Sequence, residues 1–120
     1  MLLFKKQFLE AIRSGAKTQT IRLAKVMRFR TGQRSYIPGA GYIHIDSVEP
    51  VSLCELTETD ALRDGFANLA ELRAALAAIY PSEAESAARP WRIQFHLLPA
   101  EEQVMLMARW KRAAPKTPGG

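Results

Sequence analysis

Cysteine and histidine are scarce in this chain of 120 residues, which has one cysteine, Cys54, and two histidines, His44 and His96. One cysteine excludes an internal disulfide, and a zinc site would need carboxylate ligands beside the two histidines. Neither histidine has metal-motif spacing, so we expect structural histidines, no metal and no cofactor. No motif activates Cys54, which is expected to be buried. Such cysteine usage is typical of a reducing cytosol, and we predict a cytoplasmic protein.

Long apolar runs are also absent. No stretch approaches the roughly 18 apolar residues of a membrane span. The start at Met1 reaches Lys5 and Lys6 too soon for a secretion signal, and we expect no membrane partner. With 48% hydrophobic and 24% charged residues, the composition predicts one soluble domain with its own core. Both a monomer and a weak dimer are compatible with this composition.

The charges are segregated along the chain. Residues 1–34 hold nine basic residues against one acid, whereas residues 46–85 hold nine acids against two bases. The basic segment suits an anionic partner such as an RNA backbone, but the two segments could equally attract each other across the fold. The candidates for nucleic-acid contact are Lys5, Lys6, Arg13, Lys25, Arg28 and Arg30.

The first half of the chain is expected to be mainly β. Apolar residues at helical spacing predict a helix from Lys5 to Ser14, with Gly15 past its end. Alternation and β-branched residues predict strands over 17–23, 35–37 and 42–48, the last continuing past a bend at Pro50 through 51–56. A Pro-Gly turn at 38–41 separates the second and third of these strands.

The second half is expected to be mixed. Thr57 or Thr59 is a candidate cap for a short helix ending at Arg63, and Asn68 for a helix over 69–80 that Pro81 stops. After a polar loop at 82–89, alternation predicts a half-buried strand over 91–98. The pattern at 104–110 fits a helix or a strand. We predict a strand there, paired with 91–98 in a hairpin. The same segment could also mediate contact between subunits, which is a further functional hypothesis.

One segment concentrates polar chemistry. Gly15-Ala16-Lys17-Thr18-Gln19-Thr20-Ile21-Arg22 places an amine, two hydroxyls, an amide and a guanidinium directly after a predicted helix. This density of donors suits an anionic or nucleotide-like ligand, although an exposed strand with solvated side chains has the same composition. The segment resembles the signature of the ASCH domains, G-x-K-x-x-[E/T]-x-R. The order of elements agrees over about residues 3–98, including Asp64-Gly65-Phe66 in an acidic segment and the aromatic strand near Trp91.

This resemblance implies a fold. ASCH domains are α+β and β-rich, with a PUA-like, partly closed β-barrel flanked by two or three helices. Residues 1–98 would form that domain. Residues 99–112 would be a C-terminal extension packed on it, and 113–120, with two prolines and two glycines, a flexible tail.

The resemblance also implies an activity. Thr20 replaces the glutamate of many members, as in a small bacterial branch that hydrolyses N4-acetylcytidine. By similarity, the catalytic set is Lys17, Thr20 and Asp64, with Asp64 standing where that branch has glutamate. The partner would be RNA or a modified nucleoside, bound in a cleft beside the signature. Ribonuclease activity, as in other small ASCH proteins, and RNA binding without catalysis are the alternatives. The substrate-binding candidates are Gly15, Thr18, Arg22 and Tyr36.

Elementary chemistry constrains these roles. For Lys17 to act as a base near neutral pH, its pKa must fall by about 3 units from about 10.4. A more economical scheme keeps Lys17 cationic to stabilise an oxyanion while Asp64 takes a proton from Thr20 or from water. Positions 17 and 20 face opposite sides of an ideal strand, so Lys17 must lie in a turn. Arg22 either clamps an anion or pairs with Asp64 or Glu71, and Tyr36 either stacks on a base or packs at the rim of the core.

Overall fold

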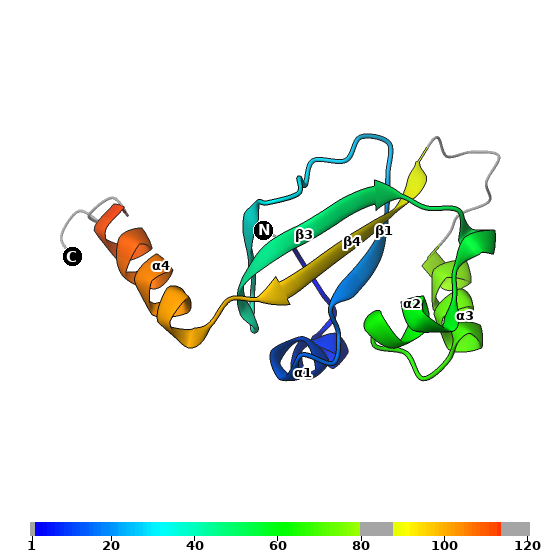
Figure 1. Cartoon of the computed structure of the whole chain (residues 1–120), viewed down its shortest axis with the longest axis horizontal. Helices are drawn as coiled ribbons and strands as arrows, with labels where there is room; N and C mark the ends of the chain where they lie inside the picture. The colour runs from blue at the N-terminus through cyan, green and yellow to red at the C-terminus, as the bar shows by residue number, and fades with distance from the viewer. Residues whose placement is uncertain (1, 80–87, 114–120) are drawn as a thin grey trace.

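A curled antiparallel sheet of four strands forms a half-barrel at the centre of this α+β protein, in the order β1-β4-β3-β2 (Figure 1). The computed structural model describes residues 2–79 and 88–113. Three expected features fall wholly or mostly outside these residues: Pro81, the loop at 82–89 and the tail at 113–120. The strands are β1 (Gln19–Ala24), β2 (Arg34–Ile37), β3 (Gly41–Pro50) and β4 (Arg89–Leu97). The described α-helices are α1 (Lys6–Ser14), α2 (Glu58–Arg63), α3 (Leu69–Ile79) and α4 (Ala100–Ala113).

The main core lies between α1 and one face of the sheet. Its buried members come from the amino-terminal segment, α1, β2, β3 and β4: Leu2, Ile12, Ile37, Ile43, Ile45, Ile93 and Phe95. Because alternate residues of a strand point to opposite faces, the isoleucines of β3 reach this core while His44 between them does not. The helix predicted over 5–14 is confirmed. Its end is also confirmed, since Gly15 has a φ of +84°, the left-handed region that glycine adopts without strain.

A second core covers the other face of the sheet at its β1 edge. Ile21 of β1 packs there with Leu56, Ala61, Leu72 and Leu76, which belong to α2, α3 and the segment before them. The caps predicted for these helices are confirmed. Thr57 accepts a hydrogen bond from the Asp60 amide, and Asn68 accepts one from the Glu71 amide. The packing of α2 and α3 against Ile21 therefore holds the carboxyl end of α2 beside β1.

A β-bulge in β3 changes which side chains share a face. Ile45 pairs with Phe95 and Ser47 pairs with Gln94, so Asp46 is an extra residue without a partner on β4. Strict alternation places Val48 on the same face as His44. The bulge instead turns Val48 toward the main core and leaves Asp46 beside the histidines.

Three expectations about the fold were wrong. Residues 51–56 do not continue β3, because the strand ends at Pro50 and a short 3₁₀ helix, η1 (Leu53–Glu55), follows. Cys54 lies in η1 and is exposed. The segment 104–110 is helical and belongs to α4, so it forms no hairpin with β4. Most of its residues are good helix formers, and β4 already pairs with β1 on one side and β3 on the other, so it has no free edge for a further strand.

Helix α4 touches the sheet mainly through its first turn. Gln103 accepts a hydrogen bond from the Tyr42 amide and donates one to the Tyr42 carbonyl, both at 2.8 Å. Beyond that turn the helix projects away from the sheet (Figure 1), and Val104, Met105 and Met107 are more than half exposed. Among the described helices none has the length and apolar character needed to cross a membrane.

The carboxylate of Asp60 joins α2 to two strands. It accepts hydrogen bonds from the Thr57 amide at 2.9 Å, from Gln19 Nε2 at 3.2 Å and from Arg92 Nη2 at 3.1 Å. Burial alone would raise the pKa of Asp60, but these hydrogen bonds and the Arg92 charge together hold it below its ordinary value. Asp60 therefore stays ionised and stabilises the fold at neutral pH.

The substitution Asp60→Asn is expected to lower the free energy of unfolding by about 3 kcal/mol at neutral pH, because an amide cannot accept from all of these donors. A lowered folded-state pKa stabilises the protein only where Asp60 is ionised. The difference from the wild type is therefore full above the unfolded pKa of about 3.9 and shrinks as the pH falls through the folded-state pKa. Urea unfolding at about pH 7 and about pH 3 measures both effects. The exposed Glu55→Gln in η1 is the control, expected within about 0.5 kcal/mol of wild type; equal losses in the two variants would contradict this role for Asp60.

Candidate functional site

Lys17 lies in a tight turn between α1 and β1. The left-handed Gly15 reverses the chain, the Lys17 amide donates to the Ala11 carbonyl at 2.9 Å, and the Thr18 amide donates to the Arg63 carbonyl at 2.8 Å. Strand β1 begins only at Gln19, so the opposite-face constraint on positions 17 and 20 does not apply. The turn thus directs the Lys17 side chain toward the carboxyl end of α2.

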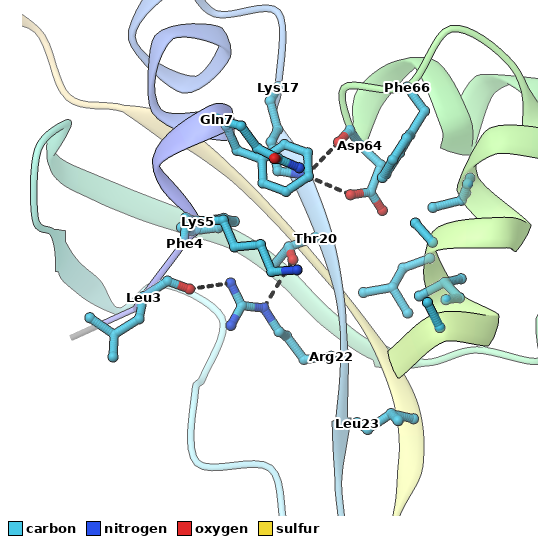
Figure 2. Close-up of a pocket in the computed structure, with 16 residues that line it drawn as sticks. Leu3, Phe4, Lys5, Gln7, Lys17, Thr20, Arg22, Leu23, Asp64 and Phe66 are labelled. Atoms are coloured by element: carbon cyan, nitrogen blue, oxygen red, sulfur yellow. Dashed lines mark hydrogen bonds and ion pairs between the residues drawn. The ribbon is translucent and has the colours of Figure 1, made fainter. Parts of the chain in front are cut away.

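Asp64 receives the Lys17 ammonium. It is the C-cap residue of α2, and Lys17 Nζ contacts both its main-chain carbonyl and its carboxylate, the latter at 2.5 Å (Figure 2). A cation at the carboxyl end of a helix also interacts favourably with the unpaired carbonyls there. Two of the three N–H groups of Lys17 are therefore used within the protein.

The pair lies in an apolar environment. Lys17 is 3% exposed and Asp64 4% exposed, and the Lys17 ammonium lies 5.7, 5.0 and 6.0 Å from the ring centres of Phe4, Phe8 and Phe66. Burial lowers the pKa of Lys17 although Asp64 opposes this, and burial raises the pKa of Asp64 although Lys17 opposes that. Both shifts bring the two groups closer to sharing one proton.

Thr20 and Arg22 lie next to each other on the same face of β1. Arg22 Nε donates to Thr20 Oγ1 at 3.0 Å, and Arg22 Nη2 donates to the Leu3 carbonyl at 2.6 Å. The guanidinium lies 4.6 Å from the ring centre of Phe4. The sequence suggested an ion pair of Arg22 with Asp64 or with Glu71. Among the described residues Arg22 forms neither of them. Because Thr20 Oγ1 already accepts from Arg22, its own hydroxyl proton is available for donation.

These residues line one pocket of about 500 Å³. Its polar wall is formed by Lys17, Thr20, Arg22 and Asp64, which come from the turn before β1, from β1 and from the end of α2 (Figure 2). The rest of the lining is mostly apolar. It comes from the segment before α1, from α1, β1 and α3, and from the segment between α2 and α3, and it includes Leu3, Phe4, Phe8, Ile21, Phe66, Leu72 and Leu76. An apolar pocket of this size with a few converging polar groups is typical of small-molecule sites.

Three predicted substrate-binding residues do not line this pocket. Gly15 shapes the turn, and Thr18 lies beside the site but is not among the lining residues. Tyr36 was predicted to bind substrate in this cleft, but it lies outside the cleft. It packs edge-on against Tyr42 at a centroid distance of 5.0 Å and lines a separate surface pocket with Gln103 and Met107. The reason is topological, since β2 and β1 are the opposite edges of the sheet.

The predicted basic contacts are divided. Lys5 lines the pocket, Lys6 is exposed on α1, and Arg13 donates to the Gly39 carbonyl at 2.7 Å, so it holds the 38–41 turn. The other three are exposed on the segment between β1 and β2, without ion pairs to described acids: Lys25, Arg28 and Arg30.

The aromatic rings around Lys17 were missed as site residues in the sequence. Phe4 and Phe8 are four residues apart, and Phe66 follows Asp64 closely, but these spacings suit ordinary core positions equally well. Only the tertiary contacts reveal that the three rings surround an ammonium group.

Comparisons with known proteins identify the fold alone. The structure is similar to the crystal structure of the hypothetical protein PH0355, with a TM-score of 0.65 and 17% sequence identity, covering 80% of this chain and 95% of that chain. No protein-family model matches the sequence, and no curated protein matches it either. At this level of identity the two proteins share a fold, and a shared fold does not identify an activity.

The ion pair itself can be tested by a double-mutant cycle. Lys17→Met and Asp64→Asn are each expected to lower the free energy of unfolding by about 3–5 kcal/mol, because each leaves a buried polar partner without its counterion. The double variant should lose clearly less than the sum, since it leaves no buried charge unpaired. Urea unfolding measures all four proteins.

The matched control is an exposed pair. Arg34 and Glu102 lie 3.6 Å apart with about half of each side chain exposed, so Arg34→Gln is expected to cost less than about 1 kcal/mol. Additive losses in the Lys17 and Asp64 variants would show that the two groups are not coupled.

Proposed function

We propose that this protein is a hydrolase of the ASCH type, with a PUA-like fold, that binds a nucleoside, free or within RNA, in the pocket between β1, α1 and α3. The most specific form of the proposal is hydrolysis of N4-acetylcytidine. It depends on one observation, that the buried Lys17–Asp64 pair and Thr20 line the same pocket. The curled half-barrel and the order of its elements are compatible with the PUA-like reading.

The chemistry is an acyl transfer to water. A water molecule adds to the acetyl carbon, either directly or after Thr20 Oγ1 has taken the acetyl group from N4 as an ester. The bond from the acetyl carbon to N4 breaks, N4 receives the proton that the nucleophile gave up, and cytidine and acetate are released. Asp64 accepts the proton of the nucleophile, and its raised pKa makes it a stronger base than an ordinary aspartate. The cations of Lys17 and Arg22 stabilise the negative charge that develops on the acetyl oxygen.

Besides stabilising the charge on the acetyl oxygen, Arg22 positions Thr20 in this scheme. Its Nε–H bond to Thr20 Oγ1 fixes the hydroxyl and favours loss of the hydroxyl proton, because a neighbouring cation stabilises an alkoxide. The aromatic rings exclude water and strengthen these electrostatic interactions. They also provide faces on which a nucleobase can stack.

Turnover should depend on Thr20. Thr20→Val keeps the shape of the side chain and removes the hydroxyl, so we expect product release to fall at least about a hundredfold while the protein stays folded. Mass spectrometry of N4-acetylcytidine, and in parallel of a short mixed-sequence RNA, measures cytidine, acetate and RNA fragments. Fragments without cytidine release would indicate the ribonuclease alternative.

Thr18→Val is the matched control, because Thr18 is two residues away and does not line the pocket. It is expected to keep wild-type turnover. Full activity in Thr20→Val would refute the assignment of Thr20, and no product from either substrate would refute a hydrolase acting on them.

A second candidate is RNA binding without catalysis. It is favoured by exposed basic residues that make no ion pair with described acids. They lie just before α1, at its start, and on the segment between β1 and β2: Lys5, Lys6, Lys25, Arg28 and Arg30. Their charge is therefore available to phosphate groups.

If these residues contact phosphates, RNA affinity should fall steeply with salt. Each phosphate contact to a single strand contributes about 0.7 to the slope of log affinity against log salt. Replacing Lys25, Arg28 and Arg30 by glutamine should therefore reduce this slope by about 2, as measured by fluorescence anisotropy with labelled RNA. Arg73→Gln on α3 is the control and should leave the slope unchanged; salt-independent binding would count against this function.

A further inference from the structure

Two histidines and an aspartate form a compact cluster on β3 and β4, away from the pocket. His44 Nδ1 and His96 Nδ1 each lie 2.9 Å from Asp46 Oδ1, and the two imidazole rings are 5.3 Å apart. One ligand atom from each residue lies within 4.8 Å of the other two. His44 is half-buried, whereas Asp46 and His96 are exposed, so the cluster is open to solvent.

Strand register and the β-bulge together create this cluster. His44 and His96 are direct cross-strand partners, so their side chains project from the same face of the sheet. Asp46 is the extra residue of the bulge, which turns its carboxylate toward both imidazoles instead of pairing with β4. The rigid pairing of two central strands thus preorganises three donor atoms.

The geometry is close to that of a bound metal. In a tetrahedral zinc site with ligands at about 2.0 Å, neighbouring ligand atoms lie about 3.3 Å apart. The observed distances of 2.9 Å between Asp46 and the imidazoles are a few tenths of an ångström shorter. Small rotations of exposed side chains suffice to open the cluster around an ion that replaces the shared protons.

We propose that His44, Asp46 and His96 form a surface site for a divalent transition metal, with zinc as the best match. Two imidazole nitrogens and one carboxylate oxygen are donors that zinc prefers, and solvent would complete the coordination. This site differs from the absence of metal expected from the sequence. It is independent of the proposed hydrolase function, because the two sites share no residue.

The surroundings are electrostatically compatible with a cation. A carboxylate in contact with both imidazoles is a donor that favours a bound cation. Arg34 is the neighbouring cation, since it is the cross-strand partner of His44 on β2. Its guanidinium is directed toward Glu102 of α4, at 3.6 Å, which offsets its charge.

Isothermal titration calorimetry with zinc chloride tests the site on the full chain, without a histidine tag. A Cys54→Ser background is used, because an exposed thiol can itself serve as a zinc ligand. We expect one zinc per chain. Loss of a group that only orients a metal ligand costs about 10–100-fold in metal affinity. Loss of a ligand itself, in His44→Ala or in His96→Ala, should therefore weaken binding about 100-fold or more. Asp46→Asn should also weaken it.

Glu49→Gln is the matched control, because Glu49 is an exposed carboxylate on the same strand that pairs with Arg92 and lies outside the cluster. It should leave zinc affinity unchanged. Thermal unfolding without metal should be similar in all the variants, since each substituted side chain is at least partly exposed. Undetectable zinc binding, undiminished affinity in His96→Ala, or one zinc per two chains would overturn a site formed within one chain.

Discussion

The buried ion pair between Lys17 and Asp64 connects the two halves of the structure. Lys17 follows α1 and Asp64 ends α2, so the pair holds the signature turn against the α2–α3 layer. Both groups are buried, and the contacts of Lys17 with a carboxylate and a helix-terminal carbonyl offset the cost of removing their charges from bulk water. The rings of Phe4, Phe8 and Phe66 complete its surroundings. The turn that holds Lys17 therefore depends on the buried pair, and the same residues shape the pocket.

The same pair partly explains the charge segregation of the chain. Lys17 from the basic segment meets Asp64 from the acidic one, so some of the opposite charge is neutralised inside the fold. Basic residues such as Lys25 and Arg28 instead remain exposed without described acidic partners. Attraction between the segments and an anionic partner are thus not exclusive alternatives, because they involve different residues.

The two faces of the sheet carry different chemistry. Thr20 pairs with Ile93 and faces the side covered by α1, where the pocket forms. Gln19 pairs with Gln94 on the opposite face, where a polar row runs from Asp60 and Arg92 through Ser47 to the His44, Asp46 and His96 cluster. A strand exposes alternate residues to two environments, so one short sheet supports both a mostly apolar pocket and a polar surface.

Local patterns in the sequence determined much of the fold. The α1 helix and its Gly15 end, the caps at Thr57 and Asn68, and the alternating strand of β4 follow from periodicity and capping within a few residues. The resemblance pointed to Lys17, Thr20, Arg22 and Asp64, which the structure gathers in one pocket. Tertiary structure alone decided the rest. Sheet order separates Tyr36 from that pocket. The bulge brings Asp46 to two histidines about 50 residues apart. Both edges of β4 are already paired, so the segment 104–110 has no strand to join there and is helical. Such pairings depend on which strands meet and in which register, and contacts between residues distant in the chain leave no local periodicity to detect.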